Sequence, residues 1–160
     1  MGGNVGNGPT LAVARENATL PATTAIPSES GIRPATARAR RVLLVEDEDM
    51  VRKVLSRMLA VRGLQVHAAA SGAEALALFD APGTEPFDLL VTDLMMPDGG
   101  GLSVARNLSE RHPGLKVLFV SGYSSAETEG WEPEQYRFLT KPFGSAELAR
   151  VIDELLHPGE

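Results

Sequence analysis

Hydrophobic patterning divides the chain at about residue 40. Before that point apolar side chains are scattered among Gly, Ala, Thr, Pro and Ser, and aromatic residues are absent. Scattered apolar positions cannot offset the entropy that is lost when a backbone becomes ordered. We therefore predict that residues 1–40 form a disordered tail or linker and that residues 41–157 form one folded domain. The basic cluster at the junction is either a solvated segment or a site for an anionic partner: Arg33, Arg38, Arg40 and Arg41.

Beyond the junction, strand-like and helix-like patterns alternate. Short apolar or alternating runs predict five strands: 42–45, 64–68, 87–92, 116–120 and 137–139. Apolar residues at helical spacing predict four helices: from Val51 toward Gly63, from Ser71 to about Asp80, from Leu102 to Arg111, and from Leu148 to Leu155. Ser71 and Glu74 form the capping-box pattern that opens the second helix.

This alternation predicts an α/β fold with helices on both faces of a parallel sheet. The second run alternates polar and apolar residues, as a half-exposed edge strand does. Five strands with the second at an edge fit the flavodoxin-like, doubly wound order 2-1-3-4-5. In such a sheet, ligands bind beyond the carboxyl ends of the strands, so we look for chemistry there.

Composition narrows the classes of function. The chain has 160 residues, a net charge of −6 and no cysteine, which excludes disulfides and thiolate sites. An acidic balance gives no sign of nucleic-acid binding. No apolar run approaches the roughly 20 residues that a membrane span needs, and the N-terminus lacks the apolar stretch of a secretory signal. We therefore expect a cytoplasmic protein with no nucleic-acid or membrane partner.

Polar residues follow four of the predicted strands. Glu46 and Asp47 follow the first strand, Asp93 the third, Ser121 the fourth and Lys141 the fifth. Neighbouring carboxylates resist joint ionisation, and an oxygen-only ligand set suits a hard cation such as Mg²⁺. An acidic metal site with an amine and a hydroxyl describes a phosphoryl-binding pocket. Asp93 is the predicted nucleophile, because a tight Pro- and Gly-rich loop follows its central strand.

Each of these residues also has an ordinary interpretation. Asp47 could be a first-turn acid that a helix dipole favours. Asp93 could be a turn residue, Lys141 a solvated surface lysine, and Ser121 alone says little. Their placement after four different strands, on one side of the predicted sheet, favours a common site.

Four ordered motifs carry a family resemblance: VLLVEDED, LLVTDLMMPDGGG, VLFVSGY and FLTKPF. Together they resemble the receiver domain of bacterial response regulators, over about Arg41 to Leu156. The resemblance implies that Asp93 is the phosphoacceptor and that Asp47 ligates Mg²⁺ directly. It also implies that Glu46 holds the ion mainly through water, and that Met95 lends its backbone carbonyl.

The resemblance assigns the remaining positions as well. Lys141 and Ser121 would bind phosphoryl oxygens, and Ser121 would draw its loop inward. Phe138 would be the aromatic switch residue, and the Lys141–Pro142 bond would be cis. Tyr123 and Met95 would partly cover the site. A histidine kinase or phosphotransfer protein would donate from a phosphohistidine, and phosphorylation would switch binding to a downstream protein partner.

The chain departs from the family pattern between Ser121 and Arg137. Receivers usually place a full helix there, but Gly130 and Pro133 predict a shortened or irregular one. Trp131 either fills the core over the gap or presents an exposed anchor. The SGY and LMMP motifs resemble receivers attached to hybrid histidine kinases, so a stand-alone regulator and the receiver end of a larger protein both remain open. We expect no output domain after Leu156.

Two other classes of function compete with the receiver. A phosphatase of the haloacid-dehalogenase type also uses an aspartyl nucleophile at a strand end, but it needs a second acid two residues later, where this chain has Met95. A pseudo-receiver would bind partners without being phosphorylated, and metal binding without phosphorylation would favour it. A receiver catalyses its own phosphorylation and dephosphorylation but is not a conventional enzyme.

Overall fold

A computed structural model describes residues 38–97, 100–122 and 134–159. The predicted tail lies outside these ranges, apart from its last three residues. The predicted irregular helix, with Tyr123 and Trp131, falls at 123–133 and is also outside the described residues.

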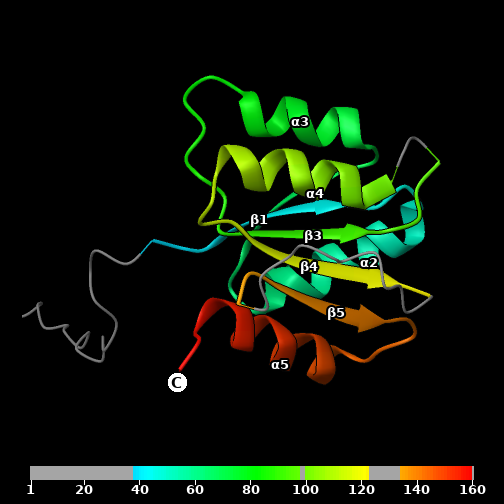
Figure 1. Ribbon diagram of the computed structural model, residues 1–160. Helices are drawn as coiled ribbons and strands as arrows, with labels where there is room; N and C mark the ends of the chain where they lie inside the picture. Colours follow the sequence, from blue (N-terminus) through cyan, green and yellow to red (C-terminus); the bar gives the residue numbers. More distant parts are fainter. Residues whose placement is uncertain (1–37, 98–99, 123–133, 160) are drawn as a thin grey trace, which may run out of the picture. The chain divides into compact units, whose positions relative to one another are not determined.

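The sheet has five parallel strands: β1 (Arg41–Val45), β2 (Gln65–Ala69), β3 (Leu89–Asp93), β4 (Lys116–Ser121) and β5 (Tyr136–Thr140). Their order is β2-β1-β3-β4-β5 (Figure 1), which confirms the predicted topology. Every residue of β1 and β3 is buried, whereas β2 is partly exposed, as an edge strand with alternating polarity should be. The residues that follow β1 and β3 therefore emerge directly from the buried core.

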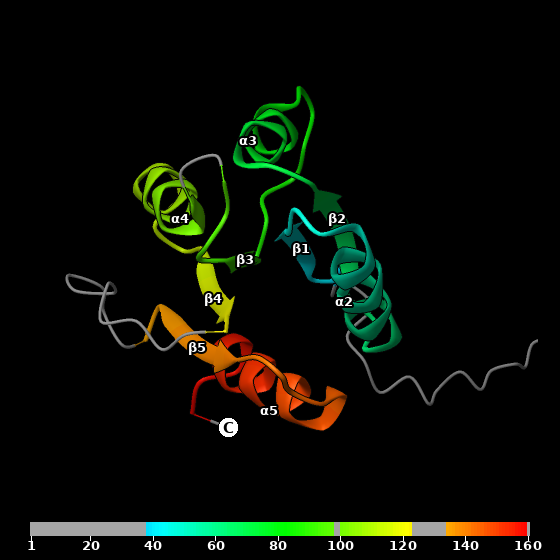
Figure 2. The ribbon, with the colours of Figure 1, turned by 90° about the vertical axis from the view of Figure 1, so that its right-hand side faces the viewer.

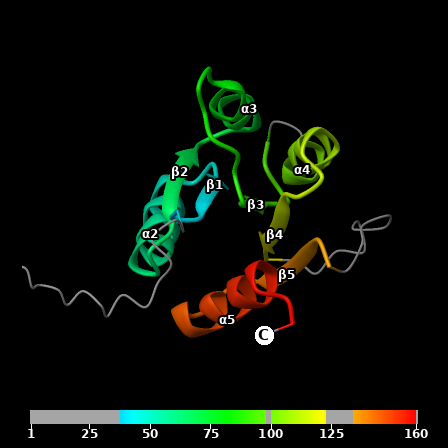
Figure 3. The ribbon, with the colours of Figure 1, turned by 90° about the vertical axis from the view of Figure 1, so that its left-hand side faces the viewer.

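The described residues form four helices: α2 (Asp49–Val61), α3 (Gly72–Asp80), α4 (Gly100–Arg111) and α5 (Ser145–Leu156). Helices α2 and α5 lie on one face of the sheet, and α3 and α4 lie on the other (Figures 2 and 3). None of these helices is long and apolar enough to cross a membrane.

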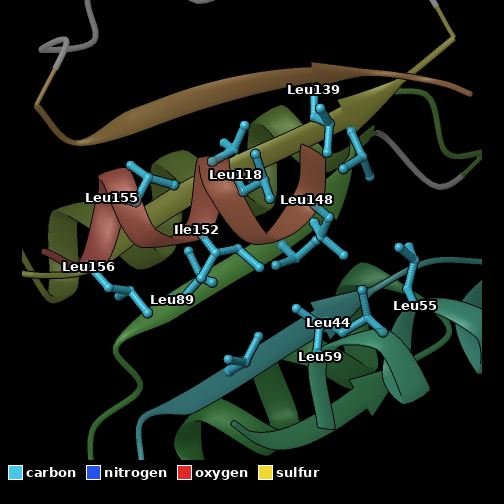
Figure 4. Close-up of a cluster of buried hydrophobic side chains, with 14 residues drawn as sticks. Leu44, Leu55, Leu59, Leu89, Leu118, Leu139, Leu148, Ile152, Leu155 and Leu156 are labelled. Carbon is cyan, nitrogen blue, oxygen red and sulfur yellow. The ribbon is translucent and has the colours of Figure 1, made fainter. Parts of the chain in front are cut away.

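The alternating directions of the strand side chains produce two separate cores. Val42 and Leu44 of β1 belong to the core beneath α2 and α5, where Leu59 and Ile152 are fully or almost fully buried (Figure 4). Leu43 belongs to the opposite core with α3 and α4. Burial of each such side chain stabilises the fold by about 1.5–3 kcal/mol relative to exposure. A sheet filled on both faces is therefore rigid enough to hold residues at its edge in fixed positions.

Two local predictions are confirmed and one is wrong. Ser71 caps α3, because its Oγ accepts a hydrogen bond from the backbone N–H of Glu74 at 3.1 Å. Gly63 follows the end of α2 with a φ of +83°, a conformation that suits glycine. The third strand, however, begins at Leu89 and not at Phe87. Phe87 is buried below the guanidinium of Arg41, 4.4 Å from its ring centroid, and so its apolar character reflects packing outside the sheet.

Candidate functional site

The carboxyl ends of four strands place polar residues along one edge of the sheet. Asp93 and Ser121 are the last residues of β3 and β4, and Glu46 and Lys141 come directly after β1 and β5. Glu46 and Ser121 are each 1% exposed, and Asp93 is 8% exposed. Ionisable and polar groups are rarely buried to this degree unless they are paired, so their partners define the site.

Lys141 joins the two buried carboxylates. Its Nζ lies 2.8 Å from Asp93 Oδ2 and 3.1 Å from Glu46 Oε2. Burial alone would lower the pKa of Lys141, but the hydrogen bonds to Asp93 and Glu46 and the attraction of both carboxylates raise it above its usual value. The ammonium group is therefore fully charged near neutral pH, between two acids that end different strands.

Glu46 responds in the opposite way. Burial raises the pKa of its carboxyl, and the negative charge of Asp93 adds to that rise. The backbone N–H of Glu48, which donates to Glu46 Oε1 at 3.2 Å, and the Lys141 ammonium only partly offset it. The net effect is a pKa of Glu46 above its usual value, mainly because the carboxyl is buried.

Backbone groups hold Asp93 from its other side. The N–H of Met95 donates to Asp93 Oδ1 at 2.8 Å, so each carboxylate oxygen of Asp93 has its own partner. The N–H of Lys141 donates to the carbonyl of Ser121 at 2.8 Å and ties the ends of β4 and β5 together. The Lys141–Pro142 bond is cis, as the family resemblance implies.

Asp47 and Met95 lie at the rim of the site. Both are exposed, Met95 to 65%, and both line one groove together with Gly100 and Arg106. The described residues offer the Asp47 carboxylate no hydrogen-bond or ion-pair partner. Among the residues that the structure describes, no group of three or more acidic or histidine side chains is close enough together to hold a metal ion. Hydrogen bonds join Glu46, Asp93 and Lys141, whereas the Asp47 side chain forms no hydrogen bond with any of them.

The donor chemistry of this edge nevertheless fits a hard cation. Two buried carboxylates, an exposed carboxylate without a partner and backbone carbonyls supply only oxygen, which is the ligand that Mg²⁺ prefers. The Lys141 ammonium already occupies a cationic position between Glu46 and Asp93. By residue type, Glu46, Asp47, Asp93 and the carbonyl of Met95 are candidate ligands for such an ion, although Asp47 stands apart from the two buried carboxylates in this structure.

Helix α4 approaches the backbone of Asp93 closely. A side chain at Gly101 would collide with the carbonyl oxygen of Asp93 and with Thr92 Oγ1. Gly100 has a φ of +86°, and the N–H of Gly101 donates to the carbonyl of Leu94 at 3.2 Å. The run of glycines after Pro97 thus allows the helix to begin directly against the residue that ends β3.

Sequence reasoning missed Arg52 of α2. Its guanidinium donates to the carbonyl of Glu46 at 2.9 Å and pairs with Asp49, three residues earlier on the helix. The i,i+3 spacing from Asp49 was the signal that could have pointed to it. The contact with Glu46, six residues away, depends on how the chain turns between β1 and α2.

Phe138 lies in β5, away from the carboxylates. It is half-buried and packs against the α3/α4 core, with its ring centroid 6.3 Å from that of Phe119. The aromatic side chain predicted as a switch is therefore in contact with β4, the strand that ends at Ser121.

Comparison with known proteins identifies the family. The model of the response regulator receiver domain matches residues 42–153. The chain belongs to this family. It is 44% identical over 117 residues to the sensor kinase CckA of Brucella abortus (strain 2308), a match that covers 72% of this chain but only 12% of CckA. It is 33% identical to the response regulator receiver protein CpdR of the same organism, over 73% of this chain and 97% of CpdR.

Solved receiver structures share the fold. The receiver domain of the hybrid histidine kinase CckA has a TM-score of 0.59 and 34% identity, over 73% of this chain and 99% of that domain. The response regulator TrrA of Thermotoga maritima, solved in complex with Mg²⁺ and BeF, has a TM-score of 0.61 and 27% identity, over 73% of this chain and 99% of TrrA. The chain is thus a two-component receiver by sequence and by fold.

Proposed function

We propose that this receiver takes a phosphoryl group onto Asp93 from a phosphohistidine of a histidine kinase or phosphotransfer protein, with Mg²⁺ as cofactor. The observation that carries the proposal is the position of Asp93. Asp93 ends the central strand β3 and is 8% exposed, and its carboxylate lies 2.8 Å from Lys141 Nζ. A fixed carboxylate nucleophile beside a fixed cation is what acyl phosphate formation requires.

In the transfer, an oxygen of Asp93 attacks phosphorus while the bond from phosphorus to the histidine nitrogen breaks. The product is an acyl phosphate, which water later hydrolyses to restore the carboxylate and release phosphate. Lys141 exchanges a carboxylate partner for a phosphoryl oxygen and stabilises its charge. Glu46, Asp47, Asp93 and the carbonyl of Met95 would hold Mg²⁺, which would supply further positive charge against the anionic group.

The switch lies where β4 and β5 meet. Ser121 reaches a phosphoryl oxygen and draws its loop inward, and its carbonyl is already bonded to the N–H of Lys141. Phe138 packs on Phe119 of the same strand pair and has no hydroxyl, so its two positions differ by packing alone. Phosphorylation then shifts an existing equilibrium and changes binding to a downstream partner.

A groove on α2 and α5 is the docking surface we propose for the phosphodonor. Both helices begin a few residues after the site: α2 starts at Asp49, close to Glu46 and Asp47, and α5 starts at Ser145, close to Lys141. Exposed Met50, Val54 and Val61 give the groove an apolar floor, and Lys53 and Arg57 give it a basic rim. This chemistry fits an amphipathic helix with acidic flanks from the kinase or phosphotransfer protein.

Phosphorylation by a small donor tests the proposal without a partner. The protein is incubated with Mg²⁺ and acetyl phosphate, and its intact mass is recorded beside the variants Asp93→Asn and Asp80→Asn. Asp80 ends α3 on the surface and is the matched control. We expect one phosphoryl adduct in the wild type and in Asp80→Asn, and none in Asp93→Asn or in the presence of chelator.

The same experiment separates the alternative. A pseudo-receiver, acting only as a protein-binding module, would bind Mg²⁺ and give no adduct. We also propose that residues 41–157 form the receiver, that residues 1–40 form a tail or linker, and that the domain works in the cytoplasm. Both a stand-alone regulator and the receiver end of a hybrid kinase suit it, since CpdR is matched along 97% of its length and CckA along 12%.

A further inference from the structure

Arg52 occupies an unusual place among the basic residues of α2. Its side chain is only 20% exposed, whereas Lys53 and Arg57 of the same helix are exposed. The guanidinium turns back over the first turn of the helix, toward the end of β1. There it donates to the carbonyl of Glu46 at 2.9 Å and pairs with the carboxylate of Asp49.

The Arg52 side chain holds the backbone just before Asp47, where its guanidinium donates to the carbonyl of Glu46 at 2.9 Å. The bond from the Arg52 N–H to the carbonyl of Glu48, at 2.9 Å, is the ordinary backbone bond of the first helical turn and does not depend on the side chain. Glu48 is the N-cap residue of α2, but its side chain makes no capping hydrogen bond. Because no capping side chain fixes this end of α2, the hydrogen bond from the Arg52 guanidinium to the carbonyl of Glu46 is the side-chain contact that ties the helix to the end of β1.

The conformation of this turn decides where the acidic side chains point. Glu46 is held by the N–H of Glu48 and by Lys141. The Asp47 carboxylate has no hydrogen-bond partner among the described residues, so its direction follows from the backbone between Glu46 and Glu48. A residue that fixes this backbone fixes the position from which Asp47 meets a cation.

We propose that Arg52 is a positioning residue that sets the Glu46–Asp47 turn and thereby strengthens Mg²⁺ binding. This inference rests on the proposed function of the site. The charge of Arg52 acts in the opposite sense, because a guanidinium repels a divalent cation. The sign of the effect therefore separates positioning from simple electrostatics: loss of positioning weakens Mg²⁺ binding, whereas loss of the charge alone strengthens it.

Calorimetric titration of the whole chain with Mg²⁺ tests the inference. The variants are Arg52→Gln, Arg52→Lys and, as matched control, Arg150→Gln on the exposed side of α5. Groups that orient metal ligands typically change metal affinity at least tenfold when they are lost. We expect about tenfold weaker Mg²⁺ binding in Arg52→Gln, partial recovery in Arg52→Lys and no change in Arg150→Gln. Equal or tighter binding in Arg52→Gln overturns the inference.

Amide hydrogen exchange without Mg²⁺ gives a second readout. We expect the amides of residues 46–49 to exchange faster in Arg52→Gln than in the wild type, and at the wild-type rate in Arg150→Gln. Unchanged exchange in Arg52→Gln would contradict the positioning role directly. If the wild type binds no Mg²⁺, the proposed cofactor fails and the inference fails with it. If the wild type binds Mg²⁺ and Arg52→Gln binds it equally well, only the inference fails.

Discussion

Substitution of Gly101 by alanine tests the contact between α4 and the end of β3. The new methyl group would collide with the carbonyl oxygen of Asp93 and with Thr92 Oγ1, and it would stand 2.9 Å from the carbonyl carbon of Asp93. Two of these atoms are backbone atoms of a central strand, and Thr92 is fully buried. No flexible side chain can yield, so the helix itself must move.

The magnitude follows from the kind of strain. Overpacking of a well-packed interior typically costs about 1–3 kcal/mol, and here the obstacle is backbone, so we expect the upper part of that range. A domain of this size loses about 3 °C in melting temperature for each kcal/mol. Gly101→Ala should therefore melt several degrees below the wild type. It should also take up a phosphoryl group more slowly, because movement of α4 displaces Asp93.

Urea denaturation and acetyl phosphate labelling measure the two effects. Gly114→Ala is the control, since an added methyl group there meets nothing closer than 3.9 Å, an ordinary contact with the His112 ring. A Gly101→Ala variant as stable as the wild type would refute the reasoning. A variant that is destabilised but labelled at the wild-type rate would refute only the link to Asp93.

Two further substitutions probe the lysine and the α3 cap. In Lys141→Gln, the pKa of Glu46, already raised by burial, should rise further because the Lys141 cation is lost. A carboxyl whose pKa is raised in the folded state opposes its own ionisation, so the stability of the fold is fully present below the ordinary glutamate pKa of 4.5 and decreases as pH rises above it. The variant should thus be about 2 kcal/mol less stable than the wild type at pH 7 and closer to it at pH 4.5, by urea denaturation. In Ser71→Ala, the loss of the hydrogen bond from Glu74 N–H should cost about 1 kcal/mol, whereas Ser71→Asn should retain most of the stability.

The sequence was sufficient for the sheet and for most of the site. Continuous apolar runs identified the central strands, and the alternating run placed β2 at the edge. Parallel strands share one carboxyl-terminal edge, so the sequence alone groups Glu46, Asp93, Ser121 and Lys141. Their order along the chain was enough, because topology alone brings strand ends together.

The contacts within the site could not be predicted in the same way. Glu46 is buried and Asp47 is exposed, although the motif resemblance gave Asp47 the more direct contact with the ion. A strand pattern no longer fixes which side chain points inward once the strand has ended. The bridge by Lys141 and the reach of Arg52 depend on side-chain conformations across the fold. The sequence pattern assigns Phe87 to the third strand for a related reason. It is buried outside the sheet, and in the sequence a buried aromatic residue next to a strand cannot be told from a residue of the strand.

Location of the phosphoryl group by borohydride reduction tests the central claim most directly. Reduction converts an aspartyl phosphate to homoserine, which peptide mass spectrometry assigns to one position after treatment with Mg²⁺ and acetyl phosphate. We expect homoserine at position 93 and an unmodified Asp47. Homoserine at Asp47, or a reduced product at Glu46, would contradict the assignment of Asp93 as the phosphoacceptor.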